Sequence, residues 1–243
     1  MQNIDKATEI IKKARHMVVF TGAGISAESG IPTFRGKGGI WDKYDPKILD
    51  IDFFTHNPEK AWPHIKEMFY NIIDKAKPNK AHFVLADWEA QGQVLSIITQ
   101  NIDNLHQKAG SEKVIEFHGN TRNLVCMNCK KITKVSNADM SQNPVNCPHC
   151  GGLLKPDFVF FGEPIPPNAY QKAIEETLLA DVYLIIGTTG IIMPASLLPY
   201  EAHKNKAKII EINVNPSNYT QQITDIFLQG KATEILNELQ KRI

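Results

Sequence analysis

The chain has 243 residues, of which 42% are hydrophobic and 22% are charged, and these proportions exclude a disordered chain, a collagen-like repeat and a small disulfide scaffold. Its 27 Lys and Arg residues nearly balance 26 Asp and Glu residues, so no chain-wide field attracts DNA or a membrane surface. No apolar run approaches the roughly 18 residues of a membrane span, and the N-terminus has the pattern of an amphipathic helix. We therefore expect a cytoplasmic globular protein.

Short apolar runs alternate with amphipathic stretches along the chain. The runs, each the length of one buried strand, cover residues 16–20, 94–99, 114–117, 158–161, 182–187 and 208–214. Helical patterns cover residues 4–14, 58–76, 79–91, 168–180, 195–204 and 231–242. This alternation predicts an α/β fold with a doubly wound parallel sheet.

The first predicted strand runs directly into a glycine-rich turn. Gly22, Gly24 and Ala27 match the G-x-G-x-x-G/A fingerprint, in which backbone N–H groups at a helix start approach a pyrophosphate. Pro32 limits the following helix to about two turns. No acidic strand end follows about 20 residues later, so the motif departs from that of a dehydrogenase. A tight strand-to-helix turn without a ligand is the alternative.

The stretch after this turn interrupts the alternation. Residues 36–78 carry Gly36, Gly38, Gly39, Pro46 and Pro58 among aromatic residues. Because glycine and proline weaken the interior of a strand, we interpret this stretch as a helical insertion rather than as sheet.

Polar side chains follow two of the predicted strands. The strand 94–99 is followed by Gln100, Asn101 and Asp103 within a polar segment that ends at His106, and capping and turn formation do not require so many polar groups. His118 follows the strand 114–117. Its unperturbed pKa of about 6.5 suits a general base near neutral pH. A structural histidine is the alternative for His118.

The cysteines form two Cys-x2-Cys pairs, Cys126 with Cys129 and Cys147 with Cys150, separated by 17 residues. This spacing is typical of a zinc ribbon, in which four thiolates close a tetrahedron and leave no position for water. We therefore predict a structural Zn²⁺ in a module of residues 121–155, with two disulfides as the alternative. His149 lies inside the second pair and is expected to be solvated.

Two later strand ends carry further candidates for a nucleotide site. Gly187, Thr188, Thr189 and Gly190 follow the strand 182–187, and Asn213 lies near the end of the strand 208–214. Open parallel sheets bind ligands at the carboxyl ends of their strands. The hydroxyl groups of the two threonines and the amide of Asn213 are therefore candidates to bind a ribose. A plain turn is the alternative for residues 187–190.

Taken together, these motifs resemble the sirtuin family of NAD-dependent protein-lysine deacylases. The matching pieces are residues 22–35, 99–106, 117–119 and 159–163 and both cysteine pairs, in the order of the family and over essentially the whole chain. The resemblance implies a Rossmann-like NAD-binding domain of residues 1–35, 79–120 and 156–243. It also implies a small domain made of the helical insertion 36–78 and the zinc ribbon 121–155. NAD and an acyl-lysine peptide would meet between the two domains.

The resemblance further implies roles for individual residues. His118 is the general base, and Asn101 positions the ribose and a water. The residues that bind NAD are Gly22, Ala23, Gly24, Ala27, Phe34, Arg35, Gln100, Ile102, Asp103, Gly187, Thr188, Thr189, Asn213, Lys231 and Ala232. The peptide is bound by strand addition to the backbone of Val159, Phe160, Phe161, Gly162 and Glu163.

The reaction implied by the resemblance transfers the acyl group to ADP-ribose. The amide oxygen of the acyl-lysine attacks the ribose carbon of NAD, and nicotinamide leaves. His118 accepts a proton from the ribose hydroxyl groups, which lets the 2′-oxygen attack the carbon of the resulting amidate, and water then yields free lysine and O-acyl-ADP-ribose. No hydride is transferred.

Two departures from the family pattern bear on specificity. Many sirtuins have Gly-Thr-Ser-Leu where this chain has Gly187-Thr188-Thr189-Gly190, so packing beside the cofactor and its affinity can differ. Sirtuins that prefer succinyl or malonyl groups carry a Tyr-x-x-Arg pair, which residues 62–71 lack. We therefore expect acetyl or another uncharged acyl group, with His64 and Lys66 as the cationic side chains of this stretch.

Other functions remain as alternatives. Protein ADP-ribosylation would use the same activated ribose. Lys130, Lys131 and Lys134 suit a nucleic-acid-binding zinc ribbon, although no aromatic platform accompanies them. The absence of an acidic ribose partner disfavours a dehydrogenase. We expect acetylated-lysine proteins or peptides as partners, with no membrane and no specific nucleic acid.

Overall fold

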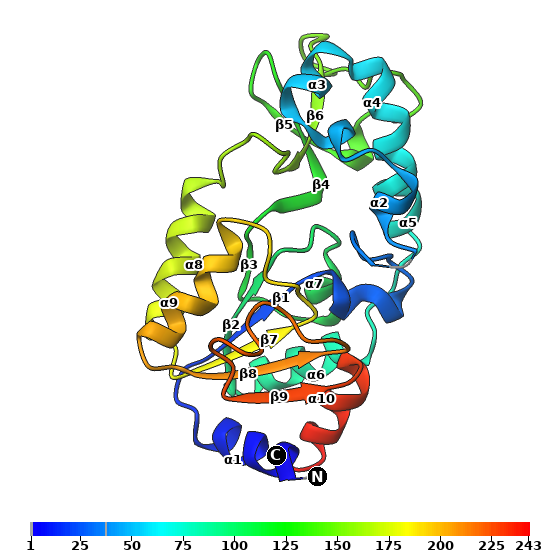
Figure 1. Cartoon of the computed structure of the whole chain (residues 1–243). Coiled ribbons are helices and arrows are strands. Elements are labelled where there is room, and N and C mark those ends of the chain that lie inside the picture. The colour runs from blue at the N-terminus through cyan, green and yellow to red at the C-terminus, as the bar shows by residue number, and fades with distance from the viewer. Residues whose placement is uncertain (1, 37) are drawn as a thin grey trace.

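Six parallel strands form the central sheet of the protein (Figure 1). The computed structural model describes residues 2–36 and 38–243. In its main sheet, β1 (Met17–Thr21) pairs with β2 (Val94–Thr99) and β7 (Val182–Ile186). β3 (Val114–Glu116) lies beyond β2, and β8 (Lys208–Asn213) and then β9 (Ile226–Gln229) lie beyond β7. The predicted α/β fold with a doubly wound parallel sheet is confirmed.

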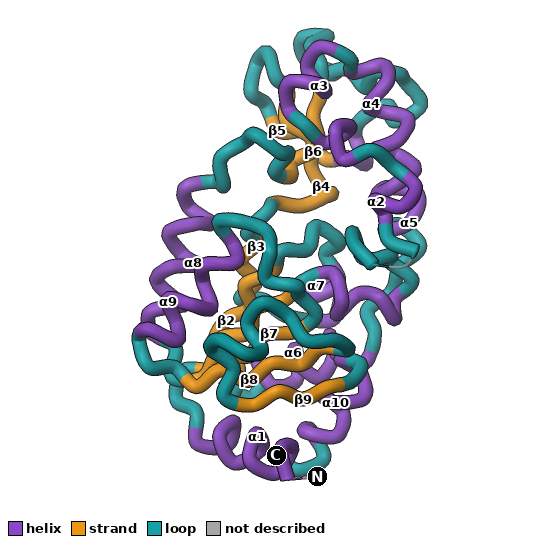
Figure 2. The backbone as a smooth tube through the Cα atoms, viewed as in Figure 1, coloured by secondary structure: helices purple, strands orange, loops and turns teal. Residues whose placement is uncertain are grey.

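Helices cover both faces of this sheet (Figure 1, Figure 2). Alternate residues of β1 enter different cores, because Met17 and Val19 belong to one cluster and Val18 and Phe20 to the other. The first cluster is completed by α1 (Gln2–Lys13), α6 (Lys80–Ala90) and α10 (Ala232–Gln240), and the second by α8 (Pro167–Leu179) and α9 (Leu198–Lys204). Burial on both faces explains why the strands are continuous apolar runs. Of the helices in the described residues, none combines the length and the apolar character needed to cross a membrane.

The insertion and the cysteine-bearing segment form a second, smaller body. The insertion consists of α2 (Ile40–Lys43), a 3-10 turn (Pro46–Leu49), α3 (Ile51–His56), α4 (Pro58–Ile65), a π-helical turn (Lys66–Tyr70) and α5 (Asn71–Ile73). It packs on a three-stranded antiparallel sheet in which β4 (Gly119–Cys126) lies between β5 (Ile132–Lys134) and β6 (Leu154–Phe158). Trp62 Nε1 donates a hydrogen bond to Leu154 O at 3.2 Å within their common core. We propose that the two segments, which share this core, make one small domain.

One predicted strand is wrong. Residues 158–161 do not join the main sheet, because β6 ends at Phe158 and runs antiparallel to β4. Phe161 makes only an isolated bridge with Asp50. The apolar run serves the core of the small domain, where the ring centroid of Phe160 lies 5.2 Å from those of Phe54 and Phe158. A short apolar run indicates burial but not the sheet to which it belongs.

Short and irregular elements were also not predicted. The patterns missed β9 and α7 (Leu105–Ala109), which span four and five residues. The helical pattern 58–76 is interrupted after Ile65 by the π-helical turn. An element of four or five residues is too short for its hydrophobic periodicity to be recognised in the sequence.

A close backbone contact fixes the start of β4 against β6. Gly119 has a φ of +79°, and a Cβ there would lie 2.3 Å from the carbonyl oxygen of Asp157 and 2.8 Å from Phe158 Cα. Only glycine fits a position with both constraints. The residue before it, His118, is therefore held directly beside the end of β6.

We expect Gly119→Ala to destabilise the protein by more than the roughly 1–3 kcal/mol of backbone strain alone, because β4 and β6 must also separate. The measurement is denaturant unfolding. The control is Gly30→Ala, where φ is +83° but a Cβ would meet nothing within 4 Å. Equal losses in the two variants would contradict the role of the close contact.

Candidate active site

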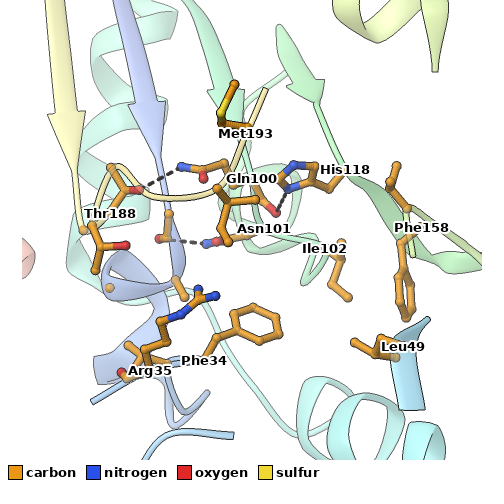
Figure 3. A pocket seen from close by; sticks show the side chains of 18 of the residues that line it. Phe34, Arg35, Leu49, Gln100, Asn101, Ile102, His118, Phe158, Thr188 and Met193 are labelled. Carbon is orange, nitrogen blue, oxygen red and sulfur yellow. Dashed lines mark hydrogen bonds between the residues drawn. The ribbon is translucent and has the colours of Figure 1, made fainter. Parts of the chain in front are cut away.

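One large cavity lies at the carboxyl ends of the main-sheet strands, where open parallel sheets bind ligands. Its volume is about 920 Å³, and loops after β1, β2, β7 and β8 line it together with residues 33–36 and 158–165. Figure 3 shows Phe34 and Arg35 across from Gln100, Asn101 and His118. The predicted site residues that line this cavity are Gly22, Ala23, Gly24, Phe34, Arg35, Gln100, Asn101, Ile102, His118, Val159, Phe160, Phe161, Gly162, Glu163, Gly187, Thr188, Thr189 and Asn213.

The glycine-rich turn is held by backbone contact with the turn after β7. Gly24 N donates to Gly187 O at 2.8 Å, and a Cβ on Gly24 would lie 2.7 Å from Gly187 Cα. A Cβ on Gly22 would lie 2.8 Å from both Gly187 O and Thr188 Cβ. The close packing of the two strand ends therefore requires glycine at these positions, whether or not a ligand binds there. The 3-10 helix that follows (Ala23–Ser29) ends at Gly30 in the left-handed conformation.

Asn101 and Asp103 are buried behind this turn. Asn101 Nδ2 donates to Gly22 O at 3.1 Å and to Ser26 Oγ at 3.2 Å. Ser26 Oγ donates to Asp103 Oδ2 at 2.7 Å, and Leu105 N donates to Asp103 Oδ1 at 2.9 Å. Burial raises the pKa of the Asp103 carboxyl, which is only 4% exposed. Both carboxyl oxygens are thus fixed in place, whereas no hydrogen bond from a described residue occupies Asn101 Oδ1.

His118 has a defined tautomer at the wall of the large cavity. Its Nδ1 lies 3.1 Å from Gln100 O, and because a carbonyl oxygen only accepts hydrogen bonds, Nδ1 carries the proton. The lone pair is therefore on Nε2. Burial lowers the pKa of His118 below its ordinary value of 6.5, so the ring is neutral at pH 7. A neutral imidazole is the state that a general base requires.

Thr188 joins three strand ends on the opposite side of the cavity. Gln100 Nε2 donates to Thr188 Oγ1 at 3.1 Å (Figure 3), and Asn213 Nδ2 donates to Thr188 O at 2.8 Å. The predicted nucleotide residues after β2, β7 and β8 therefore form one bonded group. Each of the three residues also lines the cavity.

A much smaller cavity adjoins the large one. Its volume of about 20 Å³ suits a single water molecule. Ala23, Phe34, Asn101 and Ile102 belong to the walls of both cavities. Asp103 lines only the smaller cavity, and Ser26 stands beside it there. An aromatic ring is larger than this space, so a ligand ring could enter it only if the wall formed by Phe34 moved.

Sequence reasoning missed a buried polar layer behind the two cavities. His82 Nε2 lies 3.4 Å from Ser26 Oγ, and His106 Nε2 lies 3.0 Å from Thr21 Oγ1. Burial lowers the pKa of His82 to about 4 and that of His106 well below 6.5, so both rings are neutral. Ser26 lies inside the glycine motif, so its position in the sequence could have indicated a role at the site. His82 lies on α6, and no motif in that part of the sequence indicates that it belongs to the site.

Three predicted NAD residues line neither cavity. Ala27 is exposed on the short 3-10 helix, and Ala232 packs in the core beneath the main sheet. Lys231 Nζ lies 3.7 Å from Glu28 Oε1. Their roles in binding NAD stay predictions.

The four cysteine sulfurs converge in the small domain and lie within 4.8 Å of one another. Cys126 Sγ is 3.5 Å from Cys150 Sγ, and Cys129 Sγ is 3.9 Å from Cys147 Sγ. A disulfide requires about 2.05 Å, whereas Zn–S bonds of about 2.3 Å place tetrahedral thiolates about 3.8 Å apart. This geometry suits the predicted structural Zn²⁺ and excludes the disulfide alternative. His149 is exposed, as expected, and stands outside the sulfur cluster.

The chain is similar to known proteins over nearly its whole length. Residues 22–194 match the family model of the Sir2 family. The NAD-dependent protein deacylase 2 of Pyrobaculum aerophilum is 43% identical over 239 residues, which cover 97% of this chain and 94% of that protein. A solved structure described as Sir2–p53 peptide–NAD+ has a TM-score of 0.90 at 34% identity, covering 98% of this chain and 97% of the other. A crystal structure of a Sir2 homolog–NAD complex has the same TM-score at 40% identity and covers 98% and 92%.

We expect Cys126→Ser to lose the metal and unfold the small domain, because Cys126 is both a ligand and part of the small-domain core. Bound zinc, measured by mass spectrometry of the metal, should fall from about one per chain to near zero. The His149→Ala control should keep its zinc and its unfolding midpoint. Full zinc occupancy in Cys126→Ser would contradict the assignment of this ligand.

Proposed function

The chain belongs to the Sir2 family, and on this premise we propose that the large cavity holds NAD and an acyl-lysine peptide side by side. The protein is an NAD-dependent protein-lysine deacylase. One observation carries the proposed site: Asn101 and His118, which follow two different strands, line the same cavity as the glycine-rich turn, and Ser26 connects Asn101 to Asp103 behind them. NAD supplies an activated ribose carbon and nicotinamide as leaving group.

The nucleotide part of NAD lies against the group formed by Gln100, Thr188 and Asn213. Support comes from their place at the cavity wall and from the hydroxyl, amide and backbone groups that they present. Ala23 brings a backbone N–H group to the same edge at the start of a helical turn, where anions are favoured, whereas Gly24 N is bonded to Gly187 O. Thr189 adds a second hydroxyl group.

Asn101, Ile102 and Asp103 orient the nicotinamide end. The Asp103 carboxyl is rigid because Ser26 and the Leu105 amide hold its two oxygens, so it can direct a carboxamide without moving. The unused Oδ1 of Asn101 is an acceptor for a water or a ribose hydroxyl group. The smaller cavity bounded by these three residues is where the ring would enter.

His118 accepts the proton that the ribose hydroxyl groups release. Its Nδ1 is committed to Gln100 O, which leaves Nε2 as the basic atom. The lowered pKa keeps this atom unprotonated at neutral pH. The backbone of His118 is fixed as well, since Val159 N donates to His118 O at 2.9 Å.

The acyl-lysine peptide pairs with part of the segment 159–163. Phe160 N donates to the Glu163 carboxylate, and Phe160 O accepts from Glu163 N. Phe161 N donates to Leu49 O, and Phe161 O accepts from Ile51 N. Among the described residues, Val159 O and Gly162 N make no backbone bond. These two groups are therefore available to an added strand, as are Gly162 O and Glu163 O, which accept no backbone bond from the described residues.

The acyl group enters an uncharged part of the cavity, which favours acetyl over acidic acyl groups. The insertion presents Leu49 and Phe69 to the cavity, and the end of β6 presents Phe158. Figure 3 shows Arg35 on the side of Thr188, away from Leu49. Lys66 and His64 do not line either cavity. Lys66 Nζ instead donates to Gln142 O, and the His64 ring packs on Tyr44.

The proposed function is tested with an acetylated peptide, NAD and mass spectrometry of the products. Wild type should yield deacetylated peptide and O-acetyl-ADP-ribose, whereas ADP-ribose attached to protein would support the alternative transfer reaction. His118→Ala should lower deacetylation by about 10²–10⁴ with NAD binding and zinc retained. Near-normal turnover of this variant would contradict the role of His118 as base.

We expect a succinyl peptide to have a kcat/KM at least about a hundredfold below that of an acetyl peptide, because its carboxylate would be buried without a partner. A butyryl peptide is the matched control, since its acyl chain has the same number of carbons but no charge, and it should react far better than the succinyl peptide. Equal rates for acetyl and succinyl peptides would overturn the proposed preference.

A further inference from the structure

Lys155 is a buried lysine at the second position of β6, with an exposure of only 9%. Lysine is rarely buried, because an ammonium loses its hydration and must find partners within the protein. None of the site roles above uses this side chain, and it does not line the large cavity. Its environment therefore calls for a separate physical account.

The Lys155 ammonium has as many close acceptors as it has donors. Nζ lies 2.8 Å from Pro156 O, 2.7 Å from Phe158 O and 3.0 Å from Glu163 Oε2, and an ammonium carries three N–H donors. Nζ also lies 4.2 Å from the centroid of the Phe160 ring. Burial lowers the pKa of Lys155, and the neighbouring Glu163 carboxylate opposes this shift.

These contacts shape the chain that follows β6. The ammonium donates a hydrogen bond to the carbonyl of Phe158, the last residue of the strand. Glu163, which pairs with the ammonium, also accepts a hydrogen bond from Phe160 N at 2.8 Å. One cation therefore links the end of β6 to the residue five positions later. All residues of the segment 158–163 between these two anchors line the large cavity.

The same segment carries the groups assigned above to the peptide. Val159 O follows the anchored carbonyl directly, and Gly162 N precedes Glu163 in the chain. Gly162 has a φ of +88°, so its amide direction depends on the backbone on both sides. Loss of the cation would remove the donor that the carbonyl oxygens of Pro156 and Phe158 share, and would leave the Glu163 carboxylate with the bond from Phe160 N but without its counter-ion.

We propose that Lys155 is a positioning residue for the acyl-lysine peptide, acting through Glu163 and the Phe158 carbonyl to hold Val159 O and Gly162 N in register for strand addition. The inference rests on the proposed function, because it takes the segment 159–163 as the peptide-binding edge. The described contacts of Lys155 include none of the nucleotide group of Gln100, Thr188 and Asn213. Its effect therefore falls on the peptide and not on NAD.

The test uses Lys155→Met, which keeps the apolar stem and removes the donors. The matched control is Lys134→Met, the same substitution at an exposed position of the same small sheet. At saturating NAD, the KM for an acetylated peptide should rise about tenfold or more in Lys155→Met, as expected for losing hydrogen bonds to a charged group. The Kd for NAD, measured by calorimetry, should stay within about twofold of wild type, and Lys134→Met should match wild type in both.

A second pair of variants keeps the test open if Lys155→Met folds poorly. Glu163→Gln retains an acceptor for Phe160 N and should raise the peptide KM less than Glu163→Ala, which removes it. The double variant Lys155→Met/Glu163→Ala should be no worse than either single variant, because the two residues act as one unit.

Three outcomes decide the inference. A peptide KM within twofold of wild type in folded, zinc-loaded Lys155→Met would overturn it. So would an equal rise in the Kd for NAD, since that would show a general structural role. If the wild-type protein deacetylates no acetylated peptide with NAD, the proposed function is refuted instead. The wild-type reaction therefore distinguishes failure of the proposed function from failure of the inference about Lys155.

Discussion

The site depends on the contact between two backbone turns at the centre of the sheet. The turn after β1 packs on the turn after β7 so closely that Gly22, Gly24 and Gly187 leave no space for a Cβ. This contact fixes the carbonyl of Gly22, which accepts the Asn101 amide, and it brings Thr188 within reach of Gln100. A side chain on any of the three glycines would separate the strand ends and disperse the polar groups that the parallel sheet gathers there.

A layer of buried polar side chains keeps these groups rigid. Ser26 donates to Asp103 and accepts from Asn101, and the neutral rings of His82 and His106 lie behind them. Buried polar groups are stable only when they are hydrogen-bonded, so each member limits the movement of the next. The result is a set of donors and acceptors whose directions are set before any ligand arrives, and this lowers the cost of ordering the reactants.

The structure also accounts for the departure at Gly190 from the sequence pattern of many sirtuins. The ring of the fully buried Tyr219 occupies the space of a side chain there, since a Cβ on Gly190 would lie 2.8 Å from Tyr219 Cε2. Tyr219 Oη donates to Ser196 O at 3.1 Å, and Asn218 N donates to Thr189 O at 3.1 Å. A tyrosine from the loop after β8 thus supports the same turn from another direction, and the Thr188 hydroxyl keeps its bond to Gln100.

The sequence by itself determined the fold class, the zinc ribbon and the strand ends that carry the chemistry, because these follow from local periods and fixed spacings. Apolar runs predicted β1, β2, β7 and β8, and the two cysteine pairs predicted the sulfur cluster. Only the tertiary structure decided what depends on contacts between distant segments. Phe158 and Phe160 of the run 158–161 pack with the insertion instead of in the main sheet, and the hydrogen-bond partners of Ser26 and Tyr219 lie far away along the chain. Burial and pKa shifts at Asp103 and His118 likewise arise from the surrounding packing, which a linear pattern does not encode.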